Sequence, residues 1–280
     1  MRIPLFKRYD LDSIDNMDTE LIDRVVRWFL EPLKSYFKAE VRGLERVPKG
    51  AALYVANHNS GFVPVDGFIF GGTLYKEFGI EGVPFGLGHD VIMNFPILHQ
   101  ILAPLGCIRA SHENAHRLFI NNKKALVYPG GDMETLRPYR DRDRIVFEGR
   151  CGYVRLALRE NVPIIPVVAA GAHETFFVID DMRWLAKLLR TDRWLRTEVW
   201  PAIISFPWGL TIGPPPLHFP LPTRILIEIM EPILLERSGE DAAEDDAYVH
   251  DCAHRIESSM QQTLDRLALE RKGSSHCPIN

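Results

Sequence analysis

Apolar and polar positions follow two alternating patterns along the chain. Short segments of mostly apolar residues, which predict strands, occur at 51–57, 83–87, 105–108, 124–128, 162–169 and 223–230. Segments in which apolar residues recur every three or four positions, as in helices, occur at 18–38, 90–103, 111–122, 149–160 and 247–272. The repeated order of strand, helix and strand predicts an α/β fold. We expect a mostly parallel central sheet covered by helices, with an N-terminal amphipathic helix and a C-terminal helix.

The N-terminal segment 18–38 is amphipathic. Its apolar positions are spaced for one helical face: Ile22, Val25, Phe29, Leu33 and Tyr36. Such a helix packs on the domain or lies on a membrane surface, where Trp28, Phe29 and the nearby basic residues suit the headgroup region. Pro32 is expected to kink or break it.

Two later segments are unusually apolar. Residues 181–196 predict a second amphipathic helix with five basic residues, which is typical either of membrane contact or of a solvated helix. Residues 200–222 are apolar and rich in proline, so they cannot form a long helix. They predict a buried loop or an exposed apolar surface, and 236–246 predicts an acidic linker.

Composition narrows the class of protein. The 280 residues are 46% hydrophobic, which suits one large domain, and the net charge of −4 argues against a nucleic-acid partner. The four cysteines are scattered, which predicts neither a disulfide framework nor a thiolate metal site and favours a reducing, cytoplasmic compartment. The sequence shows no signal-peptide pattern and no apolar run near the ~18–20 residues that cross a bilayer.

A histidine follows the apolar run at 51–57. Asn57 ends that run, His58 comes next, and Asp66 lies beyond a turn of seven residues. Histidine is the usual general base near neutral pH, and a carboxylate that accepts from its second ring nitrogen fixes the tautomer. The alternative is that His58 is a polar loop residue and Asp66 an acid at the start of a helix.

A second polar turn follows the run at 124–128. Gly130 and Gly131 are consecutive, so their backbone N–H groups can turn toward a ligand or a developing oxyanion. A simple tight turn is the alternative interpretation. Glu134 and Arg137 follow in the same segment.

Four segments together resemble a known family. In chain order they are 51–66, 105–115, 128–131 and 162–167. They resemble the motifs of the glycerolipid acyltransferase superfamily, whose best-known members are the lysophosphatidic acid acyltransferases, over about residues 40–175. In that family an aspartate follows the histidine after four intervening residues rather than seven. The longer turn and the Pro-Gly-Gly third motif look nearest to the diacylglycerol acyltransferase-like branch.

The resemblance implies an O-acyltransferase of lipid metabolism, such as phospholipid biosynthesis. It would move a fatty acyl group from acyl-CoA or acyl carrier protein to a hydroxyl of a glycerolipid or other lipid alcohol, without a metal or cofactor. His58 would be the base and Asp66 its orienter. The implied substrate-binding residues are Asn57, Arg109, Gly130, Gly131, Glu134 and Arg137. The acyltransferase domain would span 41–235, between an N-terminal helical segment (1–40) and a C-terminal linker and helix (236–280), and act as a cytoplasmic, peripheral protein on a membrane face.

The third motif departs from the family pattern. The family's glutamate is replaced by Gly130, and its arginine position falls on Met133. That arginine is implied to hold the phosphate of the acceptor. Its replacement favours a neutral or differently headed lipid alcohol, unless Arg109, Arg137 or Arg140 substitutes for it.

Two other functions fit parts of the sequence. His112, Glu113 and His116 form a literal H-E-x-x-H, which on a helix can bind zinc as in metallopeptidases, with Glu134 as a conceivable third ligand. The alternative is a solvated helix face. A non-catalytic lipid-binding protein of the acyltransferase fold is the remaining hypothesis.

Overall fold

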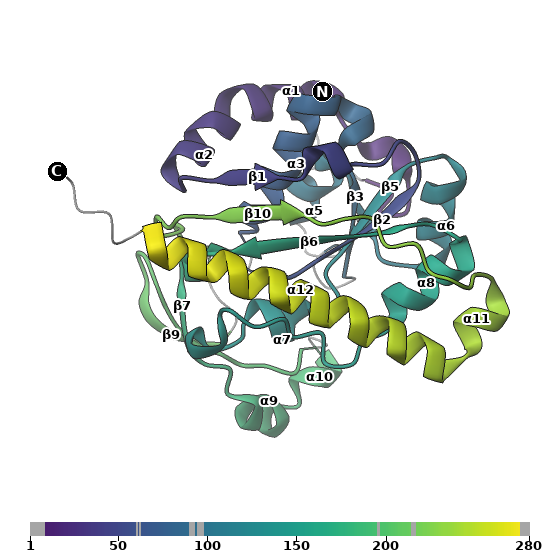
Figure 1. Cartoon of the computed structure of the whole chain (residues 1–280). Helices are drawn as coiled ribbons and strands as arrows, with labels where there is room; N and C mark the ends of the chain where they lie inside the picture. Colours follow the sequence, from purple (N-terminus) through teal and green to yellow (C-terminus); the bar gives the residue numbers. More distant parts are fainter. Residues whose placement is uncertain are drawn as a thin grey trace, which may run out of the picture.

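A seven-stranded, mostly parallel sheet forms the centre of the computed structural model, which describes residues 9–59, 61, 63–89, 93, 98–194, 197–213 and 217–274 (Figure 1). Across the sheet, the strands are β1 (Glu40–Arg42), β10 (Leu226–Ile229), β6 (Ile164–Ala170), β2 (Ala52–Ala56), β5 (Lys124–Val127), β3 (Phe85–Gly88) and β4 (Cys107–Arg109). Only the β10–β6 pair is antiparallel. The α/β fold expected from the sequence is thus confirmed.

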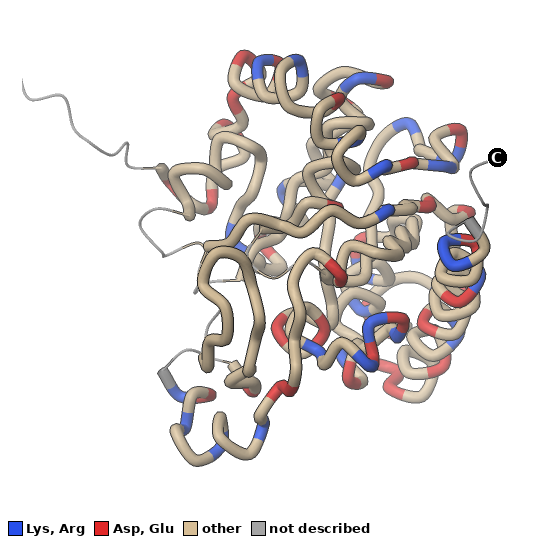
Figure 2. Tube along the Cα trace, turned by 90° about the vertical axis from the view of Figure 1, so that its left-hand side faces the viewer, with Lys and Arg blue, Asp and Glu red and all other residues tan. Residues whose placement is uncertain are grey.

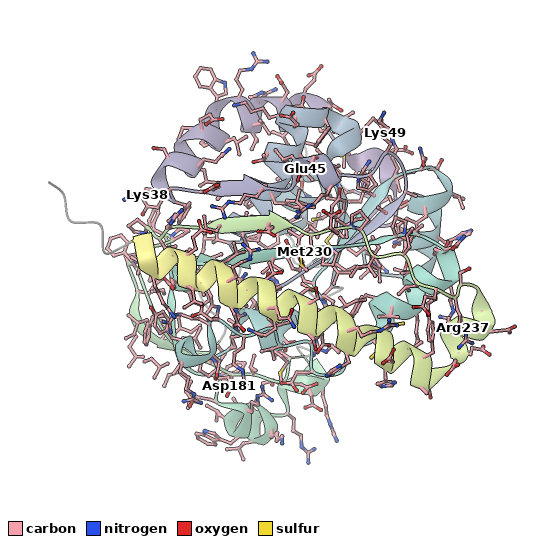
Figure 3. All side chains as sticks on the ribbon, viewed as in Figure 1. Lys38, Glu45, Lys49, Asp181, Met230 and Arg237 are labelled. Carbon is pink, nitrogen blue, oxygen red and sulfur yellow. The ribbon has the colours of Figure 1, made fainter. Side chains whose placement is uncertain are left out.

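Helices cover both faces of this sheet. One core joins β2 and β6 to α6 (His112–Ile120), α8 (Gly152–Glu160) and α12 (Asp246–Ser274), and the other joins them to α3 (Val65–Phe78). α12 runs diagonally across the front of the sheet in Figure 1, and in Figure 3 side chains fill the layer around Met230 between α12 and β10. Shorter helices of the described residues include α5 (Leu98–Leu102), α7 (Gly131–Thr135), α9 (Arg183–Leu189), α10 (Thr191–Trp194) and α11 (Glu240–Glu244). The short 3-10 turns are Ile14–Asn16, Leu44–Arg46, Ile80–Gly82, Ala103–Leu105, Tyr139–Asp141 and Ala172–Thr175.

The N-terminal helical segment is not broken at Pro32, and a π-helical turn lies just before this proline. α1 (Thr19–Val25) passes through a π-helical turn (Val26–Leu30) into α2 (Glu31–Tyr36). A π turn adds one residue to the helical repeat and therefore shifts the buried face by one position. Leu30 and Phe37 are buried, whereas Phe29 and Tyr36, which were expected on the packed face, are exposed.

The segment between β6 and β10 forms a second, three-stranded antiparallel sheet. Its strands are β7 (Phe177–Asp180), β8 (Ala202–Ser205) and β9 (Gly209–Ile212), so the apolar, proline-rich stretch contains a β-hairpin. The single helix expected over 181–196 is divided into α9 and α10, because Arg190 takes a left-handed conformation with φ of 51°. Figure 3 shows Asp181, which directly follows β7, on the other side of the central sheet from Glu45 and Lys49.

Two further segments differ from the expectation or lie partly outside the described residues. The acidic segment 236–246 contains α11 and is not a plain linker. Of the helix expected over 90–103, residues 90–92 and 94–97 lie outside the described residues, and α5 covers part of the remainder. Among the described helices, none is at once long and apolar enough to cross a membrane.

Candidate active site

The carboxyl ends of β2, β5 and β6 bring the candidate residues together. These three strands are adjacent and parallel, with β2 between β5 and β6. Their carboxyl ends therefore lie at one edge of the sheet, where binding sites of α/β sheets commonly form. His58 follows β2, the Pro-Gly-Gly turn follows β5, and His173 follows β6.

His58 lies partly buried against an aromatic ring. Its imidazole stacks on the Tyr128 ring with the centroids 4.6 Å apart and the planes at 29°. Its Nδ1 atom is buried and has no hydrogen-bond partner among the described residues. Burial, followed by the positive charge of Arg137, lowers the pKa of His58 from 6.5 to about 4. The imidazole is therefore neutral at pH 7, the form that can accept a proton.

Glu134 holds the backbone of His58. The carboxylate is fully buried, and its Oε2 accepts the His58 N–H at 2.7 Å while Oε1 accepts the Val146 N–H at 3.1 Å. Burial raises the pKa of Glu134 to about 7, against the lowering effects of Arg137 and the two N–H donors. Glu134 thus fixes the loop that carries the imidazole.

The glycine at position 130 makes room for this carboxylate. A Cβ atom on Gly130 would lie 2.5 Å from Glu134 Oε2 and 2.5 Å from the Val146 carbonyl oxygen. The Glu134 carboxylate therefore fills the space of a side chain at position 130, where the family pattern has its own glutamate. Gly131, with φ of +53°, completes the turn, and its N–H donates to the Tyr128 carbonyl at 3.1 Å.

Arg137 is a buried clamp. Its guanidinium is 2% exposed and donates all five N–H groups to oxygens of the chain. The acceptors are the backbone oxygens of His58, Glu134, Asp141 and Arg142 and Oδ1 of Asn59. These bonds fix the position of the His58 loop relative to α7.

Asp66 reaches the same loop through Asn59. Asp66 is buried in the first turn of α3, and its Oδ2 accepts from Asn59 Nδ2 at 3.2 Å. Among the described residues no hydrogen bond joins Asp66 to His58. Asn59 links Asp66 to Arg137, because the Asn59 Oδ1 accepts from the Arg137 guanidinium at 2.8 Å.

Asn57 ties β2 to β6. Its Nδ2 donates to the Ala169 carbonyl at 3.0 Å, and its Oδ1 accepts the Ala169 N–H at 2.8 Å. This reciprocal pair is fully buried and continues the β2–β6 ladder beyond its last residue. Asn57 thereby sets the direction in which the chain leaves β2 toward His58.

Sequence reasoning missed Asn59, Tyr128, Thr135 and His173 as residues of the site. Thr135 Oγ1 accepts the Gly61 N–H at 3.0 Å and donates to the Asn59 carbonyl at 3.1 Å. His173 is buried, and its Nε2 lies 2.8 Å from the Arg137 carbonyl. His173 follows a buried parallel strand as His58 does, and this signal could have identified it.

Two other candidate arginines lie next to acids rather than in the described hydrogen bonds of the His58 loop. Arg109 ends β4, three strands from β2, which is about 14 Å across the sheet. Its Nε lies 3.6 Å from Asp12 Oδ1. Arg140 is exposed, with its Nε 3.5 Å from Asp141 Oδ2.

The H-E-x-x-H residues lie on α6 and do not converge on a metal position. His116 Nδ1 lies 2.8 Å from Glu160 Oε2, and Glu113 pairs with Arg117 at 3.1 Å. Glu134, the suggested third ligand, is engaged with the His58 and Val146 N–H groups. Within the described ranges, no group of three His, Cys, Asp or Glu residues is placed to hold a metal ion.

Comparisons with known proteins bear on the family of this chain. A family model described as Acyltransferase matches residues 38–170. An uncharacterized protein of Mycobacterium tuberculosis is 29% identical over 258 residues, which cover 92% of this chain and 68% of that protein. A Mus musculus protein described as "DGAT1/2-independent enzyme synthesizing storage lipids" is 26% identical over 155 residues, 54% of this chain and 45% of that one. The crystal structure of the 1-acyl-sn-glycerophosphate (LPA) acyltransferase PlsC from Thermotoga maritima aligns over 88% of this chain and 82% of its own, with 17% identity and a TM-score of 0.48. The chain therefore carries a domain of the acyltransferase family.

Proposed function

We propose that this protein is an O-acyltransferase that transfers a fatty acyl group from a thioester donor to a hydroxyl group of a lipid alcohol, at a membrane face. The observation that carries the proposal is His58, at the carboxyl edge of β2. Its imidazole is neutral at pH 7, and its Nδ1 has no hydrogen-bond partner among the described residues. The family of the domain supplies the reaction class.

In the proposed reaction, His58 takes the proton of the acceptor hydroxyl while the oxygen attacks the thioester carbonyl. The carbon–sulfur bond then breaks, and the leaving thiolate takes the proton from the imidazolium. An ester and a free thiol result. A backbone amide of the Pro-Gly-Gly turn is the proposed oxyanion donor, and Gly130 is the candidate because the Gly131 N–H already donates to Tyr128.

Asp66, Asn57, Glu134 and Arg137 are proposed as positioning residues rather than groups that touch substrate. Each makes its described hydrogen bonds to the loop, the strand or the helix around His58. Arg137 in particular has no N–H left for a phosphate, since all five donate to the chain.

We therefore propose a neutral lipid alcohol as the acceptor. Met133 stands where the family pattern has its phosphate-holding arginine, and it is buried. The description of the mouse relative as an enzyme synthesizing storage lipids supports the same choice. Acyl-CoA and acyl carrier protein both remain candidate donors.

The test is acyl transfer from labelled acyl-CoA to a panel of mono- and diacylglycerols, lysophosphatidate and long-chain alcohols. His58→Ala is expected to lower turnover at least ~10²-fold, as loss of a general base does, with an unchanged circular dichroism spectrum. His116→Ala, an exposed histidine on α6, is the matched control and should keep wild-type turnover. Wild-type turnover in a folded His58→Ala variant, or loss only in His116→Ala, would remove His58 from this role.

A further inference from the structure

The outer face of the three-stranded sheet is exposed and apolar. Phe177 pairs across the ladder with Ile204, and Ile204 with Leu210, so the three side chains form a row. Their exposed fractions are 39%, 46% and 63%. Ile179 and Ile212 are exposed at the next positions of the same face. The alternate residues Val178 and Ile203 point inward to a small core shared with α7.

The β8–β9 turn extends this face. Phe206 and Trp208 are 61% and 57% exposed, and Leu217 and Phe219 of the returning chain are exposed beside them. The Trp208 indole N–H donates to the Leu217 carbonyl at 2.7 Å, so it would not be left unpaired in an apolar medium. Residues 199–222 contain no Asp, Glu, Lys or Arg, and the corresponding hairpin is uniformly tan in Figure 2.

Basic residues lie next to this face in sequence, on α9 and α10. Lys187, Arg190 and Arg193 are exposed, and no ion pair joins them to another described residue. Asp192 is the only acid within 183–194. Trp184, on α9, is 62% exposed. An apolar surface with tryptophan and a basic margin matches a bilayer in which acyl chains lie beneath anionic headgroups.

From these contacts we infer that the β7–β8–β9 face, with α9 and α10 as its basic margin, docks onto an anionic lipid bilayer. A protein partner fits less well, because 199–222 offers it no charged side chain with which to set specificity. Exposed apolar surface of this extent is uncommon on a protein that works free in water.

The same surface lies on the side of the molecule that carries His58. β6 and β10 are antiparallel neighbours, so the excursion between them begins and ends at the carboxyl edge of β2. Phe176, just before β7, approaches the His58–Asp66 turn so closely that a Cβ on Gly61 would lie 3.1 Å from its ring. Docking would therefore hold the His58 edge near the bilayer, where a lipid alcohol can enter. This last step rests on the proposed function, whereas bilayer binding itself does not.

The experiment is co-sedimentation with vesicles of phosphatidylcholine and phosphatidylglycerol. The double substitution Trp208→Ser and Leu210→Ser is expected to weaken binding at least about tenfold. Its matched control, Ile120→Ser with Leu269→Ser, removes equally exposed apolar side chains (66% and 68%) outside this face and should bind like the wild type. Lys187→Gln with Arg193→Gln should weaken binding about tenfold to anionic vesicles and leave binding to pure phosphatidylcholine unchanged.

Several outcomes would overturn the docking surface. These are a wild type that does not pellet with vesicles, a hairpin variant that pellets like the wild type, and a loss of binding seen only with Trp28→Ser and Phe29→Ser of the N-terminal helix. Dimers that dissociate in the hairpin variant, seen by gel filtration, would assign the face to a second copy of the chain instead. Transfer to a water-soluble short-chain monoacylglycerol is measured in parallel. Hairpin-dependent pelleting without any acyl transfer would end the proposed function and leave the docking surface standing.

Discussion

Gly130→Ala tests whether the Glu134 carboxylate holds the candidate site. An added Cβ would lie 2.4 Å from Glu134 Cβ and 2.5 Å from both Glu134 Oε2 and the Val146 carbonyl oxygen. The backbone at Gly130 has φ of −66° and ψ of −27°, which alanine adopts readily. The cost of the substitution is therefore steric rather than conformational.

The loss of stability in Gly130→Ala depends on which groups must shift to make room for the added Cβ. Glu134 Cβ and the Val146 oxygen are both held by the backbone, so relief requires the backbone of the turn or of α7 to shift, which also moves Glu134 Oε2 relative to the His58 N–H. Loss of a charge-assisted hydrogen bond costs about 1.5–3 kcal/mol, and overpacking costs about 1–3 kcal/mol. We expect the free energy of unfolding to fall by about 3–5 kcal/mol. Turnover should fall ~10- to 100-fold, because the imidazole loses its hydrogen-bonded support.

Urea unfolding and acyl-transfer rates measure the two effects. Gly152→Ala is the matched control, since this glycine opens α8 and has no atom within 4 Å of an added Cβ. That variant should be neutral or more stable by about 0.5–1 kcal/mol. If the free energy of unfolding of Gly130→Ala lies within ~1 kcal/mol of the wild-type value and its turnover is unchanged, the role given to Glu134 is refuted.

Three further substitutions test neighbouring parts of the site. The pKa of His58 is lowered in the folded state to about 4, so its contribution to stability is complete above pH 6.5 and is lost as the pH falls through 4. Between pH 7 and 5, the free energy of unfolding measured in urea should fall by about 2 kcal/mol more for the wild type than for His58→Gln. Equal falls for the two proteins would contradict the lowered pKa. Asn57→Asp removes the donor to Ala169 and buries a carboxylate against that carbonyl, which should cost about 2–4 kcal/mol by thermal unfolding, whereas Asn121→Asp on an exposed helix end should cost under ~1 kcal/mol; similar values for both would argue against the β2–β6 tie. Arg137→Lys leaves three N–H donors for five acceptors and should lower stability by about 2–4 kcal/mol, with turnover falling alike for neutral and phosphorylated acceptors; a loss confined to phosphorylated ones would return Arg137 to substrate binding.

The strands around His58 could be read from the sequence because their burial is local in pattern. β2, β5 and β6 lie within the apolar runs at 51–57, 124–128 and, but for one residue, 162–169, since strands buried on both faces have few polar positions. The start of α6 could also be predicted from nearby residues, because serine is a common helix N-cap and Ser111 Oγ accepts the Asn114 N–H at 3.0 Å. The packed face of the N-terminal segment could not be predicted in this way, since one π turn buries Leu30 and leaves Phe29 exposed.

The sequence by itself determined the fold class, the order of the main elements and the position of a histidine at the end of a buried strand. Those features depend on apolar periodicity and residue type, which each short segment carries alone. Only the tertiary structure decided the partners of that histidine. Glu134 reaches its backbone from 76 positions away, and Asp66, only seven residues on from Asn59, bonds that residue instead. Such contacts depend on how separate strands and loops come together at one edge of the sheet, and this arrangement cannot be predicted from a local sequence pattern.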